Sequence, residues 1–178
     1  MGNAGVKAFH VSANFQGVTR LTTYSGASKG VGRAIALQLA CRGCSVLGTY
    51  SSSQSAHLFD TLDHTVATLY STARLQKPKI LGTAANILDD DCASKIIDAL
   101  RTSFNGKVDI LINNAAITHR VGLGHIEVDA VKDTLLGNVQ TPFLILNAIV
   151  REGMLQKNSR IVSISSDRAR DHTFHTGA

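Results

Sequence analysis

Residues 25–32 read SGASKGVG, and this glycine-rich stretch decides the fold. A β-prone run, residues 20–24, precedes it, and a run with helical periodicity, residues 33–40, follows it. A second β-prone run, residues 45–50, comes at the distance expected for a β-α-β unit. The stretch therefore predicts the turn that joins a strand to a helix in such a unit.

The three glycines of this turn have separate purposes. Gly26 permits a sharp turn, Gly30 lets the backbone approach a ligand, and Gly32 lets the new helix pack closely on the strand. The helix then begins with free N–H groups and the positive end of its dipole, which suit a pyrophosphate. A tight loop without a ligand is the plainer alternative, and the strand–turn–helix order favours the dinucleotide site.

Length and composition limit the class of protein. The chain has 178 residues, enough for one domain, which we place at residues 18–178 behind an N-terminal arm of residues 1–17. The net charge is +5, but the basic residues are scattered along the chain and form no basic runs, so we expect no nucleic-acid partner. No apolar run reaches membrane-spanning length and no signal peptide is visible, so we expect a cytoplasmic protein that does not bind membranes.

The cysteines predict neither disulfides nor a metal site. There are three, an odd and small number that argues against a disulfide framework. Cys41 and Cys44 form a C-x-x-C pair, but no second Cys/His pair stands at ligand spacing. The run Asp89-Asp90-Asp91 is explained by the dipole at the start of a helix.

Strands and helices alternate along the chain. Further strands are predicted at residues 79–84, 108–112 and 160–164, and further helices at 56–74, from Asp89 onward and at 128–153. The second helix admits a division around Asp63-His64, and the last is predicted to be interrupted near Asn138 and Pro142. This alternation predicts an α/β fold with a doubly wound parallel sheet and right-handed crossovers.

Four motifs carry a resemblance to a known family. The turn G-x-x-x-G-x-G, preceded by Ser25 where a threonine is usual, resembles the cofactor turn of the short-chain dehydrogenase/reductase family. Residues 113–116, NNAA, resemble the family's N-N-A-G, with alanine in place of the glycine. Residues 137–143, GNVQTPF, are similar to the segment with the family's catalytic asparagine, and residues 160–166, RIVSISS, to the stretch that ends in its substrate-orienting serine.

The resemblance implies a Rossmann-type fold and a set of site residues. It implies that Asn138 and Ser166 are catalytic. The residues it implies for cofactor binding are Gly26, Ser28, Lys29, Gly30, Val31, Gly32, Tyr50, Ser51, Ser52, Asn86, Asn113 and Ala115. Of these, Asn86 stands where the family often has an aspartate near the adenine. No metal is implied.

The cofactor preference depends on the end of the second strand. An acidic residue there would bind the ribose hydroxyls and repel a 2′-phosphate, but this chain has Tyr50, Ser51 and Ser52. Lys29 matches a position where similar NADP-dependent members carry a basic residue, and a solvated surface lysine is the alternative. We therefore expect NADP(H).

The family's Tyr-x-x-x-Lys motif, which supplies the proton and holds the nicotinamide ribose, occurs nowhere in these residues. It would follow Ser166 by roughly thirteen residues, and the sequence stops at Ala178, so we expect a fold cut after its fifth strand. His172 and His175 lie near the missing motif, and polar residues of a tail are the plainer interpretation of both.

Two classes of function stay open. The first is an NADP(H)-dependent oxidoreductase of this lineage, impaired in this chain, that acts on a small-molecule carbonyl or alcohol. The second is a non-redox or pseudoenzyme protein that binds a dinucleotide. In both cases an uncovered fifth strand and helix face lead us to expect self-association.

Overall fold

The computed structural model describes residues 22–24, 27–119, 121–122 and 124–166, and it contains one parallel sheet of five strands in the order β3-β2-β1-β4-β5. The arm at residues 1–17 lies outside these residues, as do His172 and His175. The strands are β1 (Thr22–Tyr24), β2 (Val46–Tyr50), β3 (Ile80–Ala84), β4 (Val108–Asn113) and β5 (Leu155–Ser163). This order confirms the doubly wound sheet.

The strand order across the sheet reverses at β1, which lies between β2 and β4. Thr23 of β1 is in register with Leu47 of β2 on one side and with Leu111 of β4 on the other. Because every pairing is parallel, the strands all end at one edge of the sheet. In such sheets a ligand binds at that edge, where the strand order reverses.

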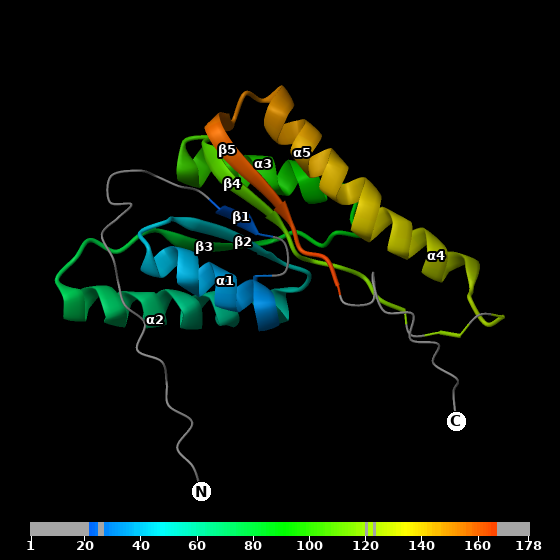
Figure 1. Ribbon diagram of the computed structural model, residues 1–178, viewed down its shortest axis with the longest axis horizontal. Helices are drawn as coiled ribbons and strands as arrows, with labels where there is room; N and C mark the ends of the chain where they lie inside the picture. Colours follow the sequence, from blue (N-terminus) through cyan, green and yellow to red (C-terminus); the bar gives the residue numbers. More distant parts are fainter. Residues whose placement is uncertain (1–21, 25–26, 120, 123, 167–178) are drawn as a thin grey trace, which may run out of the picture.

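Helices cover both faces of the sheet. Figure 1 shows α1 and α2 on one side and α3 and α5 on the other. The helical segments are α1 (Gly30–Cys41), a 3₁₀ turn η1 (Ser53–Ser55), α2 (His57–Ala73), α3 (Cys92–Phe104), α4 (Val128–Leu135), a π-helical turn η2 (Leu136–Gln140) and α5 (Thr141–Arg151).

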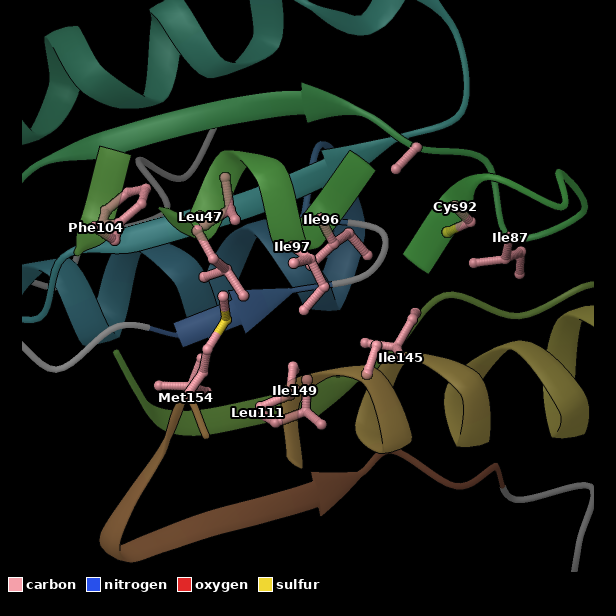
Figure 2. Close-up of a cluster of buried hydrophobic side chains, with 14 residues drawn as sticks. Leu47, Ile87, Cys92, Ile96, Ile97, Phe104, Leu111, Ile145, Ile149 and Met154 are labelled. Carbon is pink, nitrogen blue, oxygen red and sulfur yellow. The ribbon is translucent and has the colours of Figure 1, made fainter. Parts of the chain in front are cut away.

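Each face has its own hydrophobic core. Under α1 and α2 the core contains Val46 and Ile112 from the sheet together with Ala36, Leu62 and Val66. On the opposite face α3 and α5 pack over β2 and β4, as Figure 2 shows. The labelled side chains there are Leu47, Ile87, Cys92, Ile96, Ile97, Phe104, Leu111, Ile145, Ile149 and Met154. Burial on both faces explains the nearly continuous apolar run of β4.

α2 is one continuous helix, so the division around Asp63-His64 that the sequence admitted is wrong. Leu62 and Val66, one turn apart, are both fully buried, so the apolar face continues past these two residues. α2 begins at His57, one residue after the predicted start of the 56–74 helix, and the 3₁₀ turn η1 precedes it.

The predicted interruption near Asn138 is confirmed and takes the form of η2. There the N–H of Thr141 donates to the carbonyl of Leu136, five residues back. Pro142 is in the first turn of α5 and has no N–H, so it provides no helical donor to the carbonyl of Asn138. The wider turn and the proline therefore leave the helix irregular at the predicted asparagine.

β5 begins at Leu155, five residues before the predicted start at Arg160. Its early part is irregular, because Asn158 has a positive φ of 66° and the register with β4 shifts between Val108 and Ile110. Within the described part of the chain β5 pairs with β4 alone. None of the helices in the described ranges is long and apolar enough to cross a membrane.

Candidate functional site

The glycine-rich turn places the start of α1 at the carboxyl end of β1. Gly30 has a φ of +53°, a conformation that favours glycine, and a Cβ added there would meet no atom within 4 Å. The backbone of Gly30 therefore borders open space at the positive end of the α1 dipole. Gly26 lies outside the described residues. An anion such as a pyrophosphate fits this place.

The side chains of the turn divide into buried and exposed ones. Ala27 and Gly32 are buried, and Ser28 is half-buried. Lys29 is exposed and has extended backbone at the N-cap of α1, and Val31 is 61% exposed. The structure thus puts the charge of Lys29 in solvent beside the start of α1.

The end of β2 forms the second wall of the site. Tyr50 is half-buried, with its ring centroid 5.6 Å from that of Phe59, while Ser51 and Ser52 are exposed. The carbonyl of Tyr50 accepts a hydrogen bond of 3.0 Å from the N–H of Ala85, which follows β3. No carboxylate ends β2, so nothing there repels a 2′-phosphate.

Arg33 joins α1 to the first turn of α2, a contact that was not predicted from the sequence. Its guanidinium extends from α1 and donates a hydrogen bond of 2.9 Å to the carbonyl of Leu58 in the first turn of α2. This contact fixes the start of α2 relative to the glycine-rich turn. The repeat of basic residues at Lys29 and Arg33, one helical turn apart, was the available signal.

Asn86 lies in the loop after β3, and its side chain is used within that loop. Its Oδ1 accepts from the N–H of Leu88 at 3.3 Å, and its Nδ2 donates to Asp89 at 3.1 Å. These bonds shape the loop as an Asx turn. Its predicted position near the adenine stays a prediction.

The NNAA segment lies where β4 ends beside β5. The side chain of Asn113 donates to the hydroxyl of Ser163 at 3.5 Å, and its carbonyl accepts from the N–H of Ile164 at 2.9 Å. Ala115 is half-buried in the loop that follows. Ser166 lies just after β5 and is exposed. The two hydrogen bonds of Asn113 therefore hold the end of β5 beside the end of β4.

The amide of Asn138 is bound to the loop after β4. Its Oδ1 accepts from the N–H of Ile117 at 2.7 Å, and its Nδ2 donates to the carbonyl of the same residue at 2.9 Å. The neighbouring Gly137 is buried, and a Cβ there would lie 2.8 Å from Cγ1 of Ile117. The side chain of Asn138 therefore holds the helix to the loop. Its backbone carbonyl receives no α-helical hydrogen bond from residue 142, because that residue is a proline.

Thr141 makes a second contact of this kind. Its hydroxyl donates a hydrogen bond of 2.7 Å to the carbonyl of Ile87, in the loop after β3, and the residue is only 3% exposed. Neither the contact of Thr141 nor the packing of Gly137 was predicted from the sequence. A glycine within a helical run was the one available signal, since it implies close approach of another segment.

An apolar groove lies beside this helix. It has a volume of about 250 Å³ between the loop after β4 and the outer side of α4. Its lining residues are His119, Val121, Ile126, Ala130, Val131, Thr134 and Leu135. The groove is open and mostly apolar, and it adjoins the turn that carries Asn138.

Cys41 and Cys44 lie between the end of α1 and the start of β2, away from this edge of the sheet, whereas Cys92 begins α3 after the β3 loop. Cys41, Cys44 and Cys92 are buried, and none of the three forms a disulfide. Burial raises the pKa of the Cys41 thiol and the pKa of the Cys92 thiol, the latter to about 11. Both thiols therefore stay protonated at neutral pH. Among the described residues no cluster of three or more His, Cys, Asp or Glu side chains is suited to a metal ion.

Comparison with known proteins identifies the family. The sequence profile of the short chain dehydrogenase family matches residues 20–178. The 3-oxoacyl-[acyl-carrier-protein] reductase FabG of Escherichia coli is 33% identical over 153 residues, which cover 86% of this chain and 56% of the relative. The L-xylo-3-hexulose reductase of Hypocrea jecorina is 29% identical over 162 residues, covering 83% of this chain and 52% of the relative.

Solved structures agree with this match. A short chain dehydrogenase from Burkholderia cenocepacia in complex with NADP has a TM-score of 0.70 and 29% identity, covering 85% of this chain and 57% of that one. A blue fluorescent protein from a metagenomic library in complex with NADPH has a TM-score of 0.72 and 27% identity, covering 89% and 60%. The chain spans little more than half the length of these relatives. It belongs to the short-chain dehydrogenase/reductase family.

Proposed function

We propose that this protein is an NADP(H)-dependent oxidoreductase of its family, acting on the carbonyl or alcohol group of a small molecule. The observation that carries the proposal is the open space beside Gly30, with its φ of +53°, at the start of α1 and at the carboxyl edge of the sheet. That edge is where sheets of this topology bind dinucleotides. When bound, the cofactor supplies or accepts the hydride.

The preference for NADP(H) rests on charge. Lys29 is exposed beside the start of α1, and Ser51 and Ser52 are exposed at the end of β2 where a carboxylate would disfavour a 2′-phosphate. Two similar solved proteins hold NADPH and NADP, which supports the same preference here. Calorimetric titration of the protein with NADPH and with NADH tests it, and tighter binding of NADH would overturn it.

Asn138 and Ser166 are the residues we propose for the reacting end of the cofactor. The amide of Asn138 is bound to Ile117, so we assign it the task of fixing the helix, and we assign the binding of a water to its backbone carbonyl. Ser166, exposed after β5, would orient the substrate oxygen with its hydroxyl. The remaining proposed cofactor contacts are those of Gly26, Ser28, Val31, Gly32, Tyr50, Asn86, Asn113 and Ala115.

Proton transfer to the substrate is the step for which these 178 residues lack the family's usual tyrosine and lysine. No Tyr-x-x-x-Lys motif occurs among them, and general acid–base assistance typically contributes about 10²–10⁴-fold to the rate. We therefore propose that residues 1–178 alone bind NADP(H) and reduce carbonyl compounds only slowly. A non-redox or pseudoenzyme protein that binds a dinucleotide is the second candidate, and the same dinucleotide site at the start of α1 supports it.

One comparison separates the two candidates. NADPH oxidation is measured with a panel of ketones and quinones, for this chain and for the same chain extended by a family-like segment with Tyr-x-x-x-Lys. Turnover that appears only in the extended chain supports the oxidoreductase lineage. Binding of NADPH with no turnover by either chain supports the second candidate. Fast turnover by residues 1–178 alone would overturn the proposed impairment.

We further propose that the chain self-associates with a second copy of itself. The helical run α4–η2–α5 exposes large apolar side chains, among them Phe143 at 70% and Val150 at 55%. On β5, Ile161 and Val162 are also exposed, at 46% and 41%. A parallel sheet is normally covered on both faces, and a second copy offers the same apolar surfaces as a self-complementary partner.

A further inference from the structure

Thr141 departs from the pattern of every other threonine in the described helices. The other helical threonines each donate their hydroxyl to the carbonyl four residues back, the usual partner for a threonine within a helix. These are Thr61, Thr65, Thr68, Thr72, Thr102 and Thr134. Thr141 instead donates to the carbonyl of Ile87, 54 residues away in the sequence, at 2.7 Å.

Together with the bonds of Asn138, this hydrogen bond of Thr141 joins two loops of the site to one helical run. Thr141 binds the loop after β3 through Ile87, while Asn138, one turn earlier, binds the loop after β4 through Ile117. Gly137 makes both contacts possible, because a Cβ there would lie 2.8 Å from a side-chain atom of Ile117 and 3.2 Å from one of Ile87. The π-helical turn and its end thus lie against both loops at once.

The loop after β3 is in turn joined to the end of β2. The N–H of Ala85 donates to the carbonyl of Tyr50 at 3.0 Å, and Asn86 closes the loop with its bond to the N–H of Leu88. Hydrogen bonds and the short stretches of chain between them therefore connect the end of β2, through the β3 loop and Thr141, to the turn that holds Asn138. The first part borders the adenosine half of the proposed cofactor site and the last part borders the reacting half.

We propose that Thr141 is a positioning residue: it keeps the loop after β3, on the adenosine side, in a fixed position relative to the turn that carries Asn138. The inference rests on the proposed dinucleotide site and goes beyond it. Thr141 touches neither the ligand nor the reacting atoms, since its hydroxyl is buried against Ile87. It acts by keeping the Ile87 carbonyl satisfied, because a buried carbonyl without a donor moves toward water or another donor and takes its loop with it.

The test uses Thr141→Val, which keeps the shape and removes the hydroxyl, with Thr141→Ser to restore it. Thr102→Val is the matched control, because Thr102 bonds only within its own helix on the exposed side of α3. We expect Thr141→Val to bind NADPH at least about fivefold more weakly, the lower end of the usual range for coupling between sites. Thr141→Ser and Thr102→Val should stay within about twofold of the wild-type protein by the same reasoning.

A second measurement separates positioning from a general loss of stability. Amide hydrogen exchange at Ile117 reports its bond to Asn138, and it is followed with and without 2′,5′-ADP, which carries only the adenosine half of the cofactor. In the wild-type protein the added 2′,5′-ADP should slow exchange at Ile117. In Thr141→Val, Ile117 should exchange faster without ligand, and the slowing should be lost.

The possible results distinguish this inference from the proposed function. A wild-type protein that binds neither NADPH nor 2′,5′-ADP would overturn the proposed function, and exchange at Ile117 without ligand would still test the link. Thr141→Val with wild-type affinity and wild-type exchange at Ile117 would overturn the inference alone. If Thr141→Val does not fold, Thr141→Cys replaces it, because a thiol is a weaker donor than the hydroxyl of Thr141→Ser.

Discussion

The side-chain amide of Asn138 and the backbone of Ile117 bind each other in both directions, with hydrogen bonds of 2.7 Å and 2.9 Å. One amide thereby satisfies the N–H and the carbonyl of a loop residue that no strand pairs. This pairing explains why an asparagine suits the irregular turn of the helix. Aspartate would lack the donor, and a longer glutamine would not fit the same distance between helix and loop.

The first prediction concerns this pairing. We expect Asn138→Ala to lower the free energy of unfolding by about 1 kcal/mol, because two exposed hydrogen bonds are lost, each worth about 0.5 kcal/mol at the lower end of the usual range. Urea denaturation measures the change. Asn147→Ala is the control, since Asn147 is exposed on α5, and its loss should cost less than about 0.5 kcal/mol. Equal stability of the two variants would contradict the structural role of Asn138.

The second prediction concerns Gly137. Alanine favours a helix over glycine by up to about 1 kcal/mol, but its Cβ would lie 2.8 Å from Ile117, and overpacking of this kind costs about 1–3 kcal/mol. We expect the steric cost to prevail, so thermal unfolding of Gly137→Ala should begin at a lower temperature than in the wild-type protein. Gly122→Ala, with nothing within 4 Å of its added Cβ, should be close to wild type. A Gly137→Ala variant that is more stable than the wild-type protein would show that the two loops move to accommodate the added Cβ.

The sheet and its order could be predicted from sequence because alternation of short apolar strands with helices admits few topologies. The glycine-rich turn was located by its spacing, and α1 follows it as predicted. The interruption at Asn138 was also predictable, because Pro142 removes a helical donor. The division of α2 was wrong, because polar residues such as Asp63 and His64 on an exposed side do not interrupt a buried face that continues through Leu62 and Val66.

The contacts that hold the site together could not be read from the sequence. Arg33 to Leu58, Asn138 to Ile117 and Thr141 to Ile87 join residues that are 25, 21 and 54 positions apart. Each pairs a side chain with a backbone group, so the partner's residue type carries no signal. Only the three-dimensional arrangement of the helices and loops brings these groups together.

The third prediction concerns Lys29. One charge-assisted contact to a phosphate is worth about 1.5–3 kcal/mol, so Lys29→Ala should lower the preference for NADPH over NADH by about tenfold or more. Calorimetric titration with both dinucleotides measures the preference. Lys107→Ala is the control, because Lys107 is exposed just before β4, at the opposite edge of the sheet. An unchanged preference in Lys29→Ala would place the 2′-phosphate elsewhere.

The fourth prediction concerns assembly. Phe143 is 70% exposed on α5, and burying such a ring against a second copy removes apolar surface from water. We expect Phe143→Asp to shift the protein toward the monomer in light scattering and sedimentation. Val31→Ser is the control, because Val31 is also well exposed, at 61%, but lies on α1, across the sheet. A wild-type protein that stays monomeric at high concentration would disprove the proposed self-association.

The last prediction follows from the buried thiol of Cys92, which is 1% exposed. Burial, together with the carboxylate of Asp89, raises its pKa from 9.0 to about 11. Between these two values the unfolded chain loses the thiol proton while the folded chain keeps it, so unfolding releases a proton and rising pH favours it. The stabilisation by the neutral thiol is complete below about pH 9 and is lost toward about pH 11.

We therefore expect the free energy of unfolding to fall in this window, by up to about 1.4 kcal/mol per pH unit for one such group. Urea denaturation at several pH values measures the slope, and Cys92→Ala should reduce it whatever that substitution costs in packing. A remaining slope of the same sign is expected, because burial also raises the pKa values of Cys41 and Tyr70. An identical slope in Cys92→Ala and the wild-type protein would mean that the folded chain does not keep this thiol protonated.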